Sequence, residues 1–475
     1  MKTLIVLLLV IFCHTHNVTT NHLFEMVGEK IKDFADSFML ALKNIRTKMK
    51  RFLNHHFTNE KGVPRTTDRY LIEQKTRRAF SDIVEESTQD SKSDFSELEK
   101  YKHEPTALMT TPQLAKHHGK IIETHVVITG DGYLLTIHRI MRPLDQPLAD
   151  KIINPTVLLH HGLLGSSADW ILLGPENSLP YILSNLGYDV WMTNARGNCY
   201  SRGHASKNVD SLQYWKFSFQ EMGKYDLPAV VDYIRMLKNS NDSINFIGHS
   251  MGATALLVLL STTPRYNKYF RMGILLAPLA YMSNIEGPLR IFTPMAMNLP
   301  EDLLKLLGDG EFFPSRKIPT WVVKKYCKGE LLYCSNPLLF LSNIPSIGSW
   351  NTSLVARVLY HVPAGGSTNT ILHYARLVRT GKFQRFDDVA EFPLKKVTLP
   401  IALFTSSDDC LATIPDVLKL YFSIANPIDH YIIRGKNFSH NEFVFGPQAN
   451  MLVFDKVVNI LERGLNENVV KLNEV

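Results

Sequence analysis

The sequence predicts an α/β fold in which a mainly parallel β-sheet is covered by helices on both faces. Continuously apolar strands alternate with helical runs between residues 156 and 277, a pattern that is typical of strands buried on both faces. One such strand, residues 244–249, enters a Gly-His-Ser-Met-Gly turn that a helix-forming run follows directly. An acid and a histidine then follow later strands, in the chain order Ser, Asp, His that nucleophilic catalysis on this kind of sheet requires.

The Gly-His-Ser-Met-Gly turn predicts a nucleophile at its apex, Ser250. A strand-to-helix turn this tight strains the serine backbone and lifts its hydroxyl clear of the sheet. Side chains at positions 248 and 252 would collide with neighbouring backbone, which explains the glycines there. The Met251 N–H would begin the helix and face a developing negative charge. The alternative is a glycine-rich turn in which Ser250 only caps the helix.

Length and composition allow either about two or three domains or one large α/β domain with an insertion. The chain has 475 residues, of which 45% are hydrophobic, and a formal net charge of +7. That charge is small for the length, and no basic stripe with interleaved aromatic residues is present. We therefore expect no nucleic-acid partner.

Residues 1–20 predict a signal peptide, because a charged start is followed by an apolar run too short to span a bilayer. A short membrane anchor is the alternative. No later run is long and apolar enough for an integral membrane segment, so we expect a secreted or lumenal protein. Three sequons outside the signal are candidate glycosylation sites, at Asn241, Asn351 and Asn437.

Two further segments precede the globular part. Residues 21–58 carry apolar residues at helical spacing with lysines between them, which predicts an amphipathic basic helix. This helix could pack on the protein body, attach to a lipid surface or be an unstructured leader. Residues 59–104 are polar and read as a linker. Residues 75–78 within it resemble a proprotein-convertase site, although an uncut charge run is favoured.

The first part of the core is expected over residues 105–278. Two β-rich runs, 121–128 and 133–140, are joined by Gly-Asp-Gly and predict a hairpin. A later apolar strand, 156–160, leads into His-Gly-Leu-Leu-Gly. This fold places its second oxyanion N–H after such a strand, and we assign it to Leu163. The alternative is an ordinary transition from strand to loop with no catalytic role.

Residues 279–391 predict a helical cap, because apolar helical segments rich in Leu, Phe, Met and Pro interrupt the sheet there. An insertion at this point would lie over the serine, where it could bind acyl chains and exclude water. A plain helical subdomain is the alternative. The second part of the core, 392–475, contains a strand followed by Asp408 and Asp409, and a last strand at 430–434 followed by His440. Each of these residues alone would more often be a solvated loop residue.

Together these motifs make the chain resemble the acid lipase family of α/β-hydrolases, which includes gastric and lysosomal acid lipases and insect relatives. The resemblance covers about residues 111–461, and its most specific segments are 131–133, 161–164, 187–191, 196–198, 217–229, 248–252, 363–365 and 381–384.

The resemblance implies a role for individual residues. The family nucleophile falls on Ser250 and the family histidine on His440, and the orienting acid falls on Asp409 rather than Asp408, because Asp-Cys-Leu-Ala matches the family's Asp-Leu-Leu-Ala. The oxyanion donors fall on the N–H groups of Leu163 and Met251. The family usually has Gln where this chain has Met251, but a backbone donor should survive the change. The resemblance also implies a disulfide in the cap, whose positions here are Cys327 and Cys334, at a shorter spacing than in the family. The sequence leaves the pairing of Cys199 and Cys410 open.

The expected function is a serine lipase that hydrolyses carboxylic esters of neutral lipids through an acyl-enzyme, with no metal or organic cofactor. Its substrates would be triacylglycerols, steryl esters or both, met at an emulsion or membrane surface. The alternatives are a catalytically inactive lipid-binding or carrier protein and an esterase for soluble esters.

Overall fold

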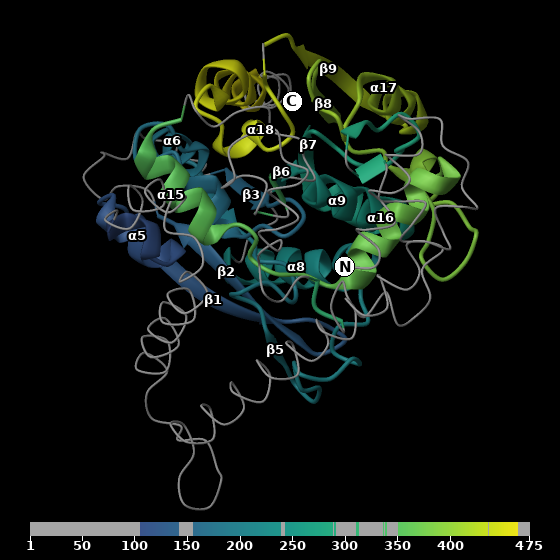
Figure 1. Cartoon of the computed structure of the whole chain (residues 1–475), viewed down its shortest axis with the longest axis horizontal. Coiled ribbons are helices and arrows are strands. Elements are labelled where there is room, and N and C mark those ends of the chain that lie inside the picture. Colours follow the sequence, from purple (N-terminus) through teal and green to yellow (C-terminus); the bar gives the residue numbers. More distant parts are fainter. Residues whose placement is uncertain are drawn as a thin grey trace, which may run out of the picture. The chain divides into compact units, whose positions relative to one another are not determined.

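In the computed structural model, the described strands form a single twisted sheet (Figure 1). The structure describes residues 105–141, 155–238, 243–287, 289–290, 310–312, 336, 338–339, 350–435 and 437–463. The chain divides into two units, Met1–Lys102 and His103–Val475, and every described residue lies in the second. Within these residues nine strands follow the order β1-β2-β4-β3-β6-β7-β8-β9, and β5 pairs with β2.

The first strands form the predicted hairpin. β1 (Ile122–Ile128) pairs antiparallel with β2 (Tyr133–Ile140). β2 also runs antiparallel to β4 (Asp189–Met192) and to the short β5 (Gly203–His204), which the sequence analysis did not predict. β1 exposes part of its residues, whereas β2 is mostly buried. The hairpin therefore adds an antiparallel margin to the sheet.

The remaining strands run parallel, as predicted. Every residue of β3, β4, β6 and β8 is buried, which explains why these runs are continuously apolar. The last strand starts three residues before the predicted one, because its first residues pair with the start of β8. The parallel strands not yet bounded are β3 (Thr156–His160), β6 (Ile244–His249), β7 (Phe270–Leu276), β8 (Ile401–Ser406) and β9 (Pro427–Ile433).

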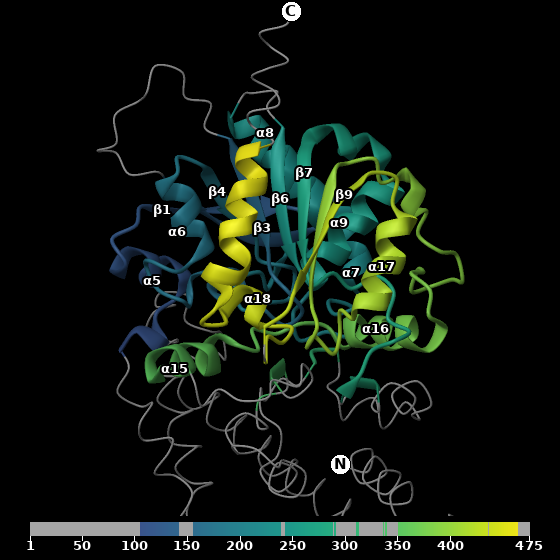
Figure 2. The ribbon, with the colours of Figure 1, turned by 90° about the horizontal axis from the view of Figure 1, so that it is seen from above.

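Helices cover both faces of the sheet (Figure 2). α6 (Leu179–Asn185) lies on one side, and α9 (Met251–Thr262) and α17 (Ile414–Ser423) lie on the other. Eleven of the residues of α9 are buried in a row, so this helix is apolar all round and forms part of the core. α8 (Leu227–Lys238) instead buries one stripe and exposes the other. The short elements are η1 (Pro105–Leu108), α5 (Thr111–His117), η2 (Ser167–Ile171), α7 (Phe219–Glu221), η3 (Met222–Asp226), η4 (Pro264–Tyr269), η6 (Leu394–Lys396) and η7 (Asn450–Phe454).

Three further helices lie along one edge of the sheet in Figure 2: α15 (Thr352–His361), α16 (Thr368–Thr380) and α18 (Glu442–Phe445). This is the carboxyl edge, because α18 follows directly on β9 and its loop. α15 and α16 come from the segment predicted as the cap. That segment also contains two isolated β-bridges, 311 to 367 and 384 to 391, which the sequence analysis did not predict.

Several predictions lie outside the described residues: the signal peptide, the basic helix and the linker of residues 1–104, the sequon at Asn241, and the pair Cys327 and Cys334. No helix in the described ranges is both long and apolar enough to cross a membrane.

Candidate active site

The sharp turn between β6 and α9 has the geometry that its sequence predicts. Ser250 lies at the apex with φ 52° and ψ −113°, a strained conformation for a residue with a side chain. A Cβ atom on Gly248 would lie 2.7 Å from the Ala253 nitrogen, and one on Gly252 would lie 2.3 Å from the His160 carbonyl oxygen. Both contacts are with main chain, so only glycine fits at either position.

Ser250, His440 and Asp409 come from the ends of three strands and form one hydrogen-bonded line. The His440 Nε2 atom lies 2.8 Å from the Ser250 hydroxyl oxygen, and the His440 Nδ1 atom lies 2.8 Å from Asp409 Oδ2. The N–H groups of Leu411 and Ala412 donate to Asp409 Oδ1 at 2.8 and 2.9 Å. All three side chains of the line are buried. The structure thus brings together the three residues that the sequence analysis selected.

The charges around Asp409 favour an ionised carboxylate. Burial opposes ionisation, but the electrostatic attraction and hydrogen bond of His440 and the two backbone N–H donors outweigh it, so the pKa of Asp409 lies below its ordinary value. A carboxylate can only accept, so His440 carries its proton on Nδ1 and presents the Nε2 lone pair to the serine hydroxyl. This is the tautomer that a general base needs.

Asp408, the competing acid, faces elsewhere. Its side chain is exposed, and its Oδ2 atom accepts the Asn437 N–H at 2.7 Å. Asp408 therefore links the loop after β8 to the loop that carries His440, without touching the imidazole in the described structure.

The turn after β3 holds the second predicted oxyanion donor, Leu163. His161 accepts the Ala195 N–H on Nε2 at 3.0 Å, so its proton lies on Nδ1, which donates to the Gly162 carbonyl oxygen at 2.7 Å. The C=O and N–H of a trans peptide point in opposite directions. With the Gly162 carbonyl held by His161, the Leu163 N–H points away from that ring, and Leu163 lines the same cavity as Ser250.

The loop after β4 supports this turn from behind. The Asn198 side-chain amide donates to the Gly165 carbonyl at 3.2 Å, and Asn194 accepts the Ser167 N–H at 2.9 Å. On the other side, the Ala364 N–H donates to the carbonyl of Leu164 at 2.6 Å, which ties the loop between α15 and α16 to the turn. Sequence reasoning missed these supports, although residues 196–198 are among the segments that carry the family resemblance.

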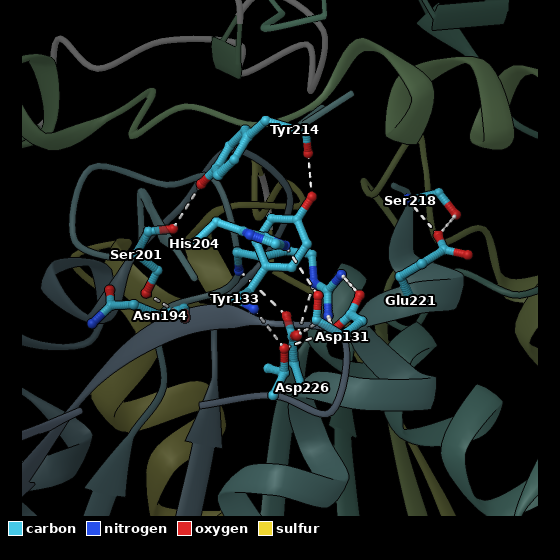
Figure 3. Close-up of polar contacts among 11 residues, drawn as sticks. Asp131, Tyr133, Asn194, Ser201, His204, Tyr214, Ser218, Glu221 and Asp226 are labelled. Atoms are coloured by element: carbon cyan, nitrogen blue, oxygen red, sulfur yellow. Dashed lines mark hydrogen bonds and ion pairs between the residues drawn. The ribbon is translucent and has the colours of Figure 1, made fainter. Parts of the chain in front are cut away.

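A buried arginine anchors that loop. The Arg196 guanidinium is fully buried and forms ion pairs of 2.6 Å with both Asp131 and Asp226. Its guanidinium carbon lies 4.0 Å from the centre of the Tyr133 ring. Figure 3 shows the two carboxylates beside that ring, whose hydroxyl donates to the Tyr214 carbonyl. Burial opposes ionisation of Asp131, but the hydrogen bonds and charge of Arg196 prevail and lower its pKa. The network ties the hairpin to the loop that supports the oxyanion turn.

An almost entirely apolar cavity opens beside Ser250. Ile371 and Tyr374 of α16 form part of its wall. The Tyr374 hydroxyl donates to Thr254 Oγ1 at 3.1 Å, and Thr254 in turn donates to the Leu279 carbonyl at 2.6 Å. The polar end of this tyrosine is thereby satisfied in the core. The residues that line the cavity are Leu163, His249, Ser250, Leu279, Met282, Leu289, Leu338, Ile371, Tyr374, Leu411, His440 and Asn441.

Five buried histidines share an unusual electrostatic property. Burial lowers the pKa of each from 6.5 to about 3 or about 4, so each ring is neutral near pH 7. We call them the buried-histidine set: His138, His160, His161, His249 and His373. Within the described part of the chain, no group of three His, Cys, Asp or Glu side chains is arranged to hold a metal ion.

Two of the predicted sequons lie at exposed positions. Asn351 caps the start of α15, where its side-chain oxygen accepts the Leu354 N–H at 2.7 Å. The amide nitrogen that a glycan would occupy is on the other branch. Asn437 is exposed and has φ 62°.

Comparisons with known proteins identify the family of the chain. The family model for the α/β-hydrolase fold matches residues 155–320, and the model for a partial α/β-hydrolase lipase region matches residues 111–174. Lipase 3 of Drosophila melanogaster is 35% identical over 366 residues, covering 72% of this chain and 90% of that protein. Gastric triacylglycerol lipase of Bos taurus is 33% identical over 385 residues, covering 77% and 94%, and that of Homo sapiens is 34% identical over 378 residues, covering 75% and 92%. The chain therefore belongs to the acid lipase family of α/β-hydrolases.

Proposed function

We propose that the protein is a serine lipase that hydrolyses carboxylic ester bonds of neutral lipids through an acyl-enzyme. The observation that carries the proposal is the hydrogen-bonded line from Asp409 through His440 to Ser250, at the edge of an apolar cavity. A hydroxyl with a neutral imidazole at 2.8 Å is an activated nucleophile.

In the first half-reaction, the Ser250 oxygen attacks the ester carbonyl carbon while its proton passes to His440 Nε2. Asp409 stabilises the imidazolium that forms. The N–H groups of Leu163 and Met251 bind the oxyanion, each typically contributing about 3 kcal/mol to lowering the barrier. The intermediate then collapses: His440 donates the proton to the alcohol oxygen, the alcohol leaves, and Ser250 keeps the acyl group.

In the second half-reaction, water attacks the acyl-enzyme by the same route. His440 takes a proton from the water, the same N–H groups bind the oxyanion, and the serine oxygen leaves with the proton from His440. The product is a free carboxylic acid, and in this proposed mechanism water and the substrate react with the chain's own residues only.

The apolar cavity wall supports an apolar acyl group as the acid part of the substrate, because apolar surface is stabilised when it leaves water. Two of the relatives are named triacylglycerol lipases, which supports triacylglycerols as substrates, with steryl esters as a second class. We further propose that the protein enters the secretory pathway through residues 1–20, carries glycans on Asn241, Asn351 and Asn437, and pairs Cys327 with Cys334.

Substitution of the nucleophile tests the proposal. Ser250→Ala should abolish hydrolysis of emulsified triolein, and a fluorescent alkyl phosphonate should label the wild-type protein on Ser250 and leave the variant unlabelled. Thr262→Ala, at the far end of α9, is the matched control and should retain both activities. An unlabelled wild type that binds fatty-acyl lipid without hydrolysing it would support a carrier and overturn the proposal. Faster hydrolysis of a soluble ester than of the emulsion would identify an esterase.

A further inference from the structure

The residue that precedes the nucleophile makes a contact that the proposed reaction does not use. We propose that His249 is a positioning residue: its imidazole N–H holds the main-chain carbonyl of His440 and so keeps the His440 side chain in place beside Ser250. This inference rests on the proposed function, because it concerns the base of the same reaction.

The hydrogen bond between the two histidines has one possible direction. The His249 Nε2 atom lies 2.9 Å from the carbonyl oxygen of His440. A carbonyl oxygen can only accept, so the proton of His249 is on Nε2 and is donated to the loop that carries the base. The centres of the two rings lie 5.1 Å apart. His249 is itself held in place, because it is the last residue of the internal strand β6 and is buried at the carboxyl end of that strand.

The other edge of the same ring faces the oxyanion turn. A Cβ atom built on Gly162 would lie 2.8 Å from His249 Nδ1, so the ring packs directly against the backbone at that position. One rigid, two-sided side chain therefore lies between the loop with His440 and the turn with Leu163. Its own main chain continues into Ser250. The positions of the nucleophile, the base and one oxyanion donor therefore all depend on the His249 ring and its main chain.

The contact acts at the catalytic position rather than elsewhere in the loop. Before His440, the loop is held by Asp408, which accepts the Asn437 N–H, and by Glu442, which accepts the Ser439 N–H. Neither of those bonds involves the His440 main chain. The His249 bond does, so its loss would release the residue whose ring must stay 2.8 Å from the serine oxygen. Misplacement of a catalytic group by about 1 Å can cost about 100-fold in rate.

The chemistry of the ring suits the place. When His440 takes the serine proton it becomes a cation, and a second cation 5.1 Å away would oppose that step. Burial, followed by the charge of His440, lowers the pKa of His249 to about 3. His249 therefore stays neutral, keeps its proton on Nε2 and keeps donating when His440 is charged. A lysine or arginine could also donate to the carbonyl, but it would bring the opposing charge.

Three substitutions at position 249 distinguish a role as hydrogen-bond donor from a role in packing alone. The amide nitrogen of Gln reaches about where imidazole Nε2 lies, the amide nitrogen of Asn reaches only about as far as Nδ1, and Phe fills the volume with no donor. We expect His249→Gln to keep most of the wild-type kcat. His249→Asn and His249→Phe should each lose about tenfold in kcat, the value of one ordinary hydrogen bond, with KM unchanged.

The matched control is His118→Phe. His118 also has one side-chain hydrogen bond, to the Tyr181 hydroxyl at 3.1 Å, but it lies after α5 and away from the cavity. This variant should lower the melting temperature slightly and leave kcat unchanged. If His249→Phe does not fold, the comparison of Gln with Asn decides. Equal kcat values for Gln, Asn and wild type would overturn the proposal, and so would equal losses in Gln and Asn.

A stoichiometric readout separates this proposal from the function itself. The rate at which an alkyl phosphonate labels Ser250 depends on His440 as base but needs neither a lipid surface nor turnover. If the wild type labels rapidly without hydrolysing lipid esters, the proposed function fails. The labelling rates should then still rank wild type and Gln above Asn and Phe. If all four rates are equal while the wild type hydrolyses lipid normally, the positioning role fails and the function stands.

Discussion

Adding one methyl group at the nucleophile turn should disable the protein. In Gly252→Ala, the new Cβ atom would lie 2.3 Å from the carbonyl oxygen of His160 and 2.8 Å from its carbonyl carbon. Both are main-chain atoms at the end of β3, a strand that is paired with β4 on one side and with β6 on the other. Neither atom can move without breaking the centre of the sheet, so the turn that carries Ser250 must move instead.

The size of the effect follows from that displacement. An ordinary contact begins at 3.4 Å, so the turn must shift by about 1 Å, which for catalytic geometry costs about 100-fold in rate. Overpacking of a buried site costs typically about 1–3 kcal/mol of stability. We therefore expect kcat to fall about 100-fold and the free energy of unfolding to fall by about 2 kcal/mol, since this contact is with rigid backbone.

The measurements are ester hydrolysis, phosphonate labelling of Ser250 and urea unfolding. Gly130→Ala is the control, because a Cβ atom there would have its nearest neighbour at 3.9 Å, in ordinary contact with the Tyr225 ring. That variant should change stability by less than about 0.5 kcal/mol. If Gly252→Ala keeps the wild-type kcat and unfolding free energy, the close approach of the turn to β3 is not what places the serine.

Three further predictions concern the acid, the oxyanion turn and pH. Asp409→Asn should lower kcat by about 10³–10⁴-fold, because an amide no longer fixes the tautomer of the His440 base. Asp408→Asn keeps an oxygen that accepts the Asn437 N–H, so its kcat should change little. Similar losses of kcat in both variants would contradict the assignment of Asp409. His161→Phe loses the N–H that holds the Gly162 carbonyl and should lower kcat by about 100-fold. The side-chain amide of His161→Asn reaches the Nδ1 position, so this variant should recover part of that loss. Equal kcat values for the two variants would show that His161 does not hold the oxyanion turn through this hydrogen bond. The buried-histidine set has pKa values of about 3 to 4 in the folded state against 6.5 unfolded, so the unfolded state binds more protons in that window and the free energy of unfolding should fall as pH drops from 6.5 toward 4. Burial raises the pKa of Asp169 to about 7 and also raises the pKa values of Asp226 and Glu442, so three carboxyl groups oppose the five histidines. The lowered pKa values of Asp131, Asp189 and Asp409 act in the same direction as the histidines. Urea unfolding at pH 5 that shows a stability equal to or above that at pH 7 would refute the sign.

The fold and the nucleophile turn could be predicted because they depend on local pattern. A strand buried on both faces must be apolar throughout, so β3, β6 and β8 were visible as apolar runs. A strained turn leaves room for glycine alone at two fixed offsets, so the pattern of Gly248 and Gly252 identifies Ser250 as the residue at the apex. The three polar residues could be placed at one edge because the carboxyl ends of parallel strands meet there, and their chain order matches the order of this fold.

The partners of those residues could not be read in the same way. Asp408 and Asp409 are neighbours after the same strand, and residue pattern alone does not tell them apart; the family resemblance favoured Asp409, and the packed loops show that it faces His440 while its neighbour faces Asn437. The hydrogen bond from His249 joins residues 191 positions apart.

Each of these bonds depends on how separate loops pack against one another at the carboxyl edge of the sheet. Hydrophobic periodicity reports which face of an element is buried, but it carries no information about which loop atoms meet there. The helices and strands and their order along the chain can therefore be predicted from the sequence. The tautomers, donors and acceptors at the site are instead decided by long-range packing.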